Sequence, residues 1–105
     1  GVYFPASFNI DASDSSRAFA AAYEKAYGNA PDLWAATGYT MMQTVANAVK
    51  NAGTDVNRET LRAAMAATKN LPVVLGQGKL SFDENRIPSM GGIVMKWKNG
   101  ERVIP

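Results

Sequence analysis

Residues 31–53, PDLWAATGYTMMQTVANAVKNAG, predict the longest helix of the chain. Asp32 is a favourable N-cap, because its carboxylate can accept a hydrogen bond from a free N–H group of the first turn. Gly53 ends the helix, since glycine readily adopts the left-handed conformation found after a helix C-terminus. Apolar and small residues recur between them at helical spacing and predict a wide buried stripe. This stripe consists of Trp34, Ala35, Gly38, Tyr39, Met42, Val45, Ala46 and Val49.

A shorter helix is expected on each side of this segment. Upstream, residues 13–16 supply several N-cap candidates, aromatic residues follow at helical spacing, and Gly28 is a suitable stop before Pro31. Downstream, Asn57 begins a third helix that ends near residues 68–70. Its inward residues are predicted to be Leu61, Ala64 and Met65. We interpret Met41, Met42 and Met65 as core residues rather than as ligands of a metal.

Short β-prone segments lie before and after the helices. Residues 2–4 form a strand that Pro5 closes, because proline cannot donate to a sheet ladder. Residues 71–78 are interpreted as an apolar connection, residues 79–82 alternate as a strand, and residues 83–86 form a turn.

The C-terminal residues predict a β-hairpin. Apolar residues alternate over residues 93–98, and Asn99-Gly100 follows as a strong signal for a two-residue turn, since both positions tolerate positive φ. Residues 102–104 form the returning strand. The order of one strand, three helices and several short strands predicts an α/β fold.

The first strand has no candidate partner close to it in sequence, and we expect it to pair with a segment outside these residues. The helices also carry more apolar surface than they need to cover one another. The chain is therefore predicted to be part of a larger sheet-and-helix structure. An isolated copy is predicted to dimerise or to exchange elements with a second copy, because unpaired edges and apolar patches drive association.

Composition excludes several classes of function for these residues. The 105-residue chain has no histidine and no cysteine, which removes Ser-His-Asp and Cys-His catalysis and the commonest zinc ligands. We therefore expect no catalytic residue, no metal site and no cofactor. The net charge is only +2 and basic residues are dispersed, which disfavours binding to nucleic acid. Neither a membrane-spanning run nor a signal peptide occurs in the sequence.

An ordered set of short motifs resembles the leucine/isoleucine/valine-binding family of periplasmic solute-binding proteins. The set consists of Phe19-x3-Tyr23-x3-Tyr27-Gly28, Pro31, Gly38-Tyr39, Ala52-Gly53, Arg58-Glu59-x-Leu61-Arg62, Gly78-x-Leu80-Ser81-Phe82-Asp83-x-Asn85 and Asn99-Gly100. The resemblance covers essentially the whole chain. It implies a C-terminal fragment of the type I periplasmic-binding-protein fold, which has two α/β lobes around a cleft.

The resemblance also implies how the fragment is divided. Residues 1–4 would be a strand of the C-terminal lobe, and residues 5–9 a segment crossing between the lobes. Residues 10–75 would be the helical part of the N-terminal lobe, and residues 76–105 the return and the terminal hairpin. The hinge is expected at Pro5, Ala6, Ser7 and Phe8.

The ligand-binding residues implied by the resemblance are Trp34, Tyr3 and Phe4. Trp34 lies at the start of a helix, where an indole can pack on an apolar ligand and free N–H groups attract an anion. The alternative for Trp34 is a core aromatic on the stripe, and strand packing is the alternative for Tyr3 and Phe4.

Two positions depart from the family pattern. Thr40 stands where relatives often have an acidic residue, and Arg86 where they often have glycine. The second departure predicts that Asn85 takes the positive φ of the turn.

The function implied is the extracytoplasmic solute-binding component of an ABC importer. Its partners would be a small-molecule ligand, a branched-chain amino acid or another small carboxylate or aromatic acid, and the membrane permease. The location would be periplasmic, with the export signal upstream of these residues. Two alternatives remain: an amide- or nutrient-sensing regulator with the same fold, and a small helical interaction domain that uses the third helix for recognition. The second alternative is disfavoured because Arg58, Arg62 and Lys69 are too few and too dispersed.

Overall fold

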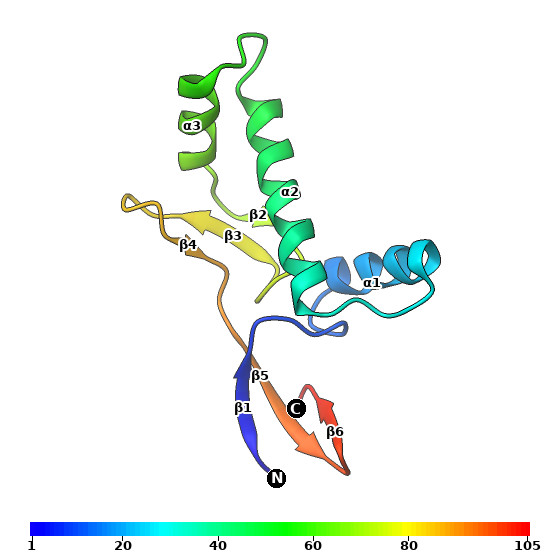
Figure 1. The fold of residues 1–105 in the computed structure, drawn as a ribbon. Coiled ribbons are helices and arrows are strands. Elements are labelled where there is room, and N and C mark those ends of the chain that lie inside the picture. Colours follow the sequence, from blue (N-terminus) through cyan, green and yellow to red (C-terminus); the bar gives the residue numbers. More distant parts are fainter.

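The computed structural model describes all 105 residues as an elongated molecule with two parts (Figure 1). The first part contains three helices and a small antiparallel sheet. The helices are α1 (Asp14–Tyr27), α2 (Leu33–Asn51) and α3 (Arg58–Ala66). The sheet has the order β2-β3-β4, formed by β2 (Leu71–Pro72), β3 (Lys79–Phe82) and β4 (Pro88–Ser89). None of the helices combines the length and apolar character that a membrane span requires.

The second part is a three-stranded antiparallel sheet with the order β1-β5-β6. Its strands are β1 (Tyr3–Ala6), β5 (Ile93–Lys98) and β6 (Glu101–Val103). Both termini of the chain lie in this part, and two segments connect it to the first part, one from β1 to α1 and the other from β4 to β5 (Figure 1).

Caps confirm the predicted starts of α2 and α3 and the predicted end of α1. The Asp32 carboxylate accepts a hydrogen bond from the Ala35 N–H at 2.9 Å, as its N-cap role requires. Asn57 accepts from the N–H groups of Glu59 and Thr60, and Thr60 Oγ1 accepts from the Asn57 N–H, which completes a capping box. Gly28 ends α1 in the left-handed conformation, with φ of 80°.

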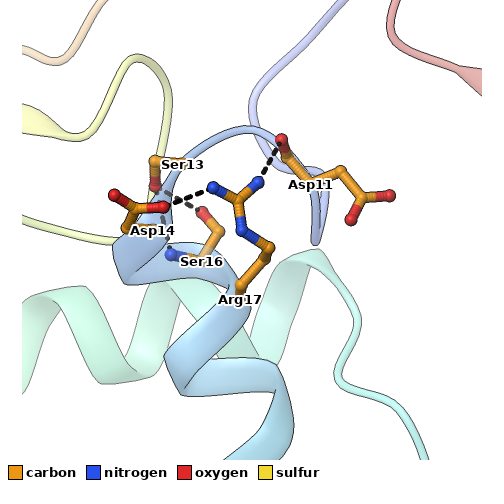
Figure 2. Close-up of polar contacts among 5 residues, drawn as sticks. All are labelled: Asp11, Ser13, Asp14, Ser16 and Arg17. Carbon is orange, nitrogen blue, oxygen red and sulfur yellow. Dashed lines mark hydrogen bonds and ion pairs between the residues drawn. The ribbon is translucent and has the colours of Figure 1, made fainter.

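Polar contacts among residues 11–17 hold the start of α1 together (Figure 2). Ser13 caps the helix by accepting from the Ser16 N–H at 3.1 Å. The Ser16 hydroxyl is fully buried and donates to the carbonyl of Val74 at 3.0 Å. Arg17 pairs with Asp14 and donates to the Asp11 carbonyl, so the first turn and the preceding loop are held together.

The core of the helical part forms where the segment after α3 packs with residues of α1 and α2. Its four buried residues are Phe19, Ala36, Val74 and Leu75. Val73 is also fully buried, and Leu71–Pro72 form β2. Residues 71–78 are thus the predicted apolar connection, to which the structure adds the two-residue strand β2 and a share of the core.

The buried face of α2 differs from the predicted stripe. The residues that are fully or nearly fully buried are Ala36, Thr40, Thr44 and Ala48. Large residues of the predicted stripe are exposed, with Tyr39 at 47% and Met42 at 63%, and Met41 is equally exposed at 63%. The small side chains on this face of α2 let neighbouring segments pack closely against it. Close packing therefore decides which face of α2 is buried, and the larger apolar side chains of the predicted stripe do not. Part of the stripe instead lines an open groove of about 750 Å³ between α1 and α2.

Pairing of β1 corrects two expectations. β1 lies beside β5, with Tyr3 opposite Lys96 and Ala6 opposite Ile93, so its partner is at the other end of this same chain. Pro5 lies within the strand, opposite Val94, instead of closing it. The structure accommodates this proline because β1 is an edge strand, in which a residue without an N–H group is tolerated.

The turn residues follow the sequence with one exception. Asn99 and Gly100 have φ of 53° and 82° and connect β5 to β6, which confirms the hairpin. Residues 83–86 form the predicted turn, in which the Asp83 carboxylate accepts from the N–H groups of Asn85 and Ile87. The positive φ falls on Arg86, at 65°, and the prediction for Asn85 was wrong. The Asp83 bond to the Asn85 N–H belongs to an Asx turn, which leaves the left-handed position to the next residue.

Candidate functional site

A cavity of about 340 Å³ lies between the β1-β5-β6 sheet and the start of α2. Its lining residues are Phe4, Ala6, Phe8, Asn9, Pro31, Asp32, Leu33, Trp34, Met95 and Arg102. The lining thus comes from both parts of the molecule and from one of the two segments that connect them. Nowhere in the chain do three or more Asp, Glu, His or Cys side chains form a group that could hold a metal ion.

Trp34 is the second residue of α2 and contributes the largest side chain of the cavity. It is 76% exposed, so it is not the enclosed core aromatic that its place on the apolar stripe would suggest. Asp32 and Pro31 place it there, because they stop the preceding loop and start the helix immediately before it. An exposed indole beside an apolar wall can hold a flat or branched apolar group by contact on two sides.

The opposite wall comes from one face of the β1-β5-β6 sheet. Phe4 and Ala6 point to this face, and Met95, which is only 2% exposed, lies directly opposite Phe4 on β5. The ring of Trp97 supports Phe4 at a centroid distance of 6.0 Å. Successive side chains of a strand point to opposite faces, so Phe4 lines the cavity and its neighbour Tyr3 does not.

Tyr3 was predicted as a ligand-binding residue, but it does not line this cavity. It is 58% exposed, and its ring lies 5.2 Å from the ammonium group of Lys96, its partner on β5. This packing against a neighbouring strand corresponds to the alternative interpretation of Tyr3.

Arg102 is a lining residue that sequence reasoning missed. It lies on β6 directly opposite Trp97, and no carboxylate lies within 4 Å of it, since Arg17–Asp14 is the one ion pair of the chain. The other polar side chains of the lining already have partners: Asp32 caps α2, and Asn9 accepts from the Asp11 N–H at 2.8 Å. Arg102 is therefore the charged group that remains free to bind an anion in the cavity. The Asn99-Gly100 turn could have indicated the position of Arg102, because a hairpin with this two-residue turn pairs residue 97 with residue 102.

The predicted hinge residues separate into two pairs. Pro5 and Ala6 belong to β1, where they pair with β5. The carbonyl of Ser7 accepts a hydrogen bond from the Gly76 N–H at 2.8 Å, and the ring of Phe8 packs on Phe19 with a centroid distance of 6.2 Å. Ser7 and Phe8 are thus attached to the helical part, and the chain passes from one part to the other between Ala6 and Ser7.

Three solved structures are similar to the chain over nearly all of its length. One is a protein from Rhodospirillum rubrum assigned as a branched-chain amino acid ABC transporter, with 36% identity and a TM-score of 0.89. A leucine binding protein from Thermotoga maritima has 25% identity and a TM-score of 0.77. A solute binding protein of an ABC transporter from R. palustris, in complex with benzoate, has 27% identity and a TM-score of 0.76.

These similarities cover 100%, 100% and 98% of this chain, respectively. The chain spans only 30%, 30% and 28% of the length of those proteins. A comparison with curated proteins gives no significant match. The family model for periplasmic binding proteins matches residues 1–102. The prediction that the chain is a fragment of this α/β fold is confirmed. The chain belongs to the periplasmic binding protein family.

Proposed function

We propose that this chain is part of the extracytoplasmic solute-binding component of an ABC importer and that it contributes part of the ligand site. The observation that carries the proposal is the cavity that joins the two parts of the molecule, in which exposed Trp34 and the unpaired Arg102 both take part. A site between two parts is the usual place for a small molecule to bind, because both can contribute contacts.

The ligand we propose is a small carboxylate with an apolar body, either a branched-chain amino acid or an aromatic acid. Trp34, Phe4 and Met95 supply apolar surface, and Arg102 supplies a cation for a carboxylate. The first turn of α2 also lines the cavity, through Leu33 and Trp34. Two of the similar proteins support this class, since one is a leucine binding protein and another was solved with benzoate.

We propose that the two parts of the chain belong to different lobes. The helices with the β2-β3-β4 sheet would belong to one lobe, and the β1-β5-β6 sheet to the other. The crossings between the lobes would lie between Ala6 and Ser7 and at Met90–Gly92. The two-part arrangement in Figure 1 supports this division. The location outside the cytoplasm and a membrane permease as partner follow from the same proposal.

The test is ligand binding by the full-length protein. A thermal-shift screen would compare leucine, isoleucine, valine, phenylalanine, benzoate and small amides, because a ligand of the folded state raises the melting temperature by mass action. Isothermal titration would then give the affinity of each compound that raises it. If neither amino acids nor aromatic acids bind while amides do, the ligand class proposed here is wrong.

Two variants connect binding to the cavity. Trp34→Ala and Arg102→Gln should each weaken binding of the identified ligand by about tenfold or more, the loss expected for about 1.4 kcal/mol of contact. Tyr27→Ala is the matched control, because Tyr27 is 71% exposed but lies at the far end of α1. If all three variants bind the ligand with the same affinity, the cavity is not part of the ligand site.

A further inference from the structure

The loop Leu75–Gly78 contacts both segments that connect the two parts of the molecule. The N–H of Gly76 donates to the carbonyl of Ser7 at 2.8 Å, in the first connection. The N–H of Gln77 donates to the carbonyl of Met90 at 2.8 Å, at the start of the second connection. One loop therefore holds two segments that lie at opposite ends of the sequence.

This loop is firmly attached to the helical part. Its own turn is closed by the Gly78 N–H donating to the Leu75 carbonyl at 3.0 Å. Val73 and Val74, which precede the loop, are buried, as is Leu75, and the Val74 carbonyl accepts from the Ser16 hydroxyl. Because Leu75 and Gly76 are buried and the loop is hydrogen-bonded, it has little freedom to move and can serve as a fixed point for both connections.

Gly76 permits this close approach. It is buried and has φ of 56°, in the left-handed region. A Cβ atom at this position would overlap the carbonyl oxygens of Met90 and Gly91. Only glycine lets the loop lie directly against the second connection.

The hydrogen bonds confine the pivot between the parts to a few torsion angles. In the first connection, Ser7 is held by the loop and the preceding Ala6 is already in β1. In the second, Gly91 and Gly92 alone separate Met90 from the first residue of β5. Two consecutive glycines, the first with φ of 67°, can absorb a change in backbone angle that other residues would resist.

Gln77 reaches across this pivot. Its side-chain amide donates to the carbonyl of Gly92 at 3.0 Å, beyond the point at which the loop backbone holds Met90. The same side chain lies against Gly91, where an added Cβ would come within 2.8 Å of its Cδ. Rotation about Gly91 or Gly92 displaces the carbonyl and lengthens this hydrogen bond, which therefore favours one angle between the two parts.

We propose that Gln77 is a positioning residue that sets the angle between the two parts of the molecule. The inference rests on the proposed function only in that the two parts would flank the ligand. Loss of the amide should broaden the range of angles, since the glycine pivot would then turn with less restraint. Ligand binding would weaken in turn, because the cavity walls from the two parts would no longer be held at one separation.

The test measures the angle without using any ligand. Spin labels are placed on the full-length protein at Asn51→Cys, at the end of α2, and at Lys98→Cys, at the end of β5, since both residues are exposed and this chain has no cysteine. Pulsed electron spin resonance then gives the distance distribution between the two parts. Gln77→Ala and Gln77→Glu should each broaden or shift it, because neither side chain can donate to the Gly92 carbonyl.

Lys79→Ala is the control, an exposed residue next to the same loop that makes no side-chain hydrogen bond. It should leave the distribution unchanged. Circular dichroism of each variant confirms that the fold is retained, and Gln77→Glu preserves the size of the side chain if Gln77→Ala proves unstable. Unchanged distributions in folded Gln77 variants overturn the proposal. The measurement uses no ligand, so its result does not depend on whether any screened compound binds. Failure of the ligand proposal can therefore be distinguished from failure of the proposal for Gln77.

Discussion

Replacement of Gly76 by alanine should destabilise the protein far more than the same change at Gly28. Both glycines have positive φ, 56° and 80°, so each variant bears the cost of a left-handed alanine, about 1 kcal/mol. Their surroundings differ. A Cβ at Gly76 overlaps backbone carbonyls of the second connection, whereas a Cβ at Gly28 meets nothing within 4 Å. Forcing a methyl group into a filled site adds about 1–3 kcal/mol, because backbone has to move.

The free energy of unfolding of the full-length protein should therefore fall by about 2–4 kcal/mol for Gly76→Ala, the sum of the two costs, and by about 1 kcal/mol for Gly28→Ala. Urea denaturation followed by circular dichroism measures both, provided that each variant shows one cooperative transition with the same slope. Equal losses for the two variants would refute the reasoning, since the steric contact with Met90 and Gly91 would then have no energetic consequence.

Three further outcomes are expected. Ser16→Ala leaves the buried Val74 carbonyl without its side-chain donor and should lower the free energy of unfolding in urea by about 1–3 kcal/mol. Ser15→Ala removes no hydrogen bond and serves as the control, and an equal loss of stability in both variants would count against the Ser16 bond. The isolated 105-residue chain should associate in light scattering because Trp34, Tyr39 and Tyr27 lie exposed around the groove between α1 and α2; a stable monomer at high concentration would contradict this. The full-length protein should become more compact in small-angle scattering when its ligand is added, and an unchanged radius of gyration at saturation would indicate a static binder.

Local signals predicted the helices and the hairpin well. Asp32, Asn57, Gly28 and Asn99-Gly100 act through hydrogen bonds or backbone angles within a few residues, so their effect can be read from neighbouring positions. The turn prediction failed where the choice between two adjacent residues depended on a contact with a third residue. Asn85 and Arg86 are adjacent candidates for one positive φ, and the Asp83 carboxylate decided between them.

The candidate site was predictable in part. The start of α2 placed Trp34 at an exposed helix end, and the position of Phe4 on a strand put it near the passage between the two parts. Which side of β1 faces the cavity could not be predicted without the register, so Tyr3 and Phe4 could not be separated. Arg102 shares the cavity only because β6 folds back beside β5.

The sequence by itself determined the three helices, the terminal hairpin and the family resemblance, because each depends on spacing within short segments. Tertiary structure alone decided the partner of β1, the buried side of α2 and the role of the loop Leu75–Gly78. These features depend on contacts between residues that are distant in sequence. A strand of four residues or an amphipathic helix can pack against several different neighbours. The observed neighbours are those that pack closely enough to exclude water.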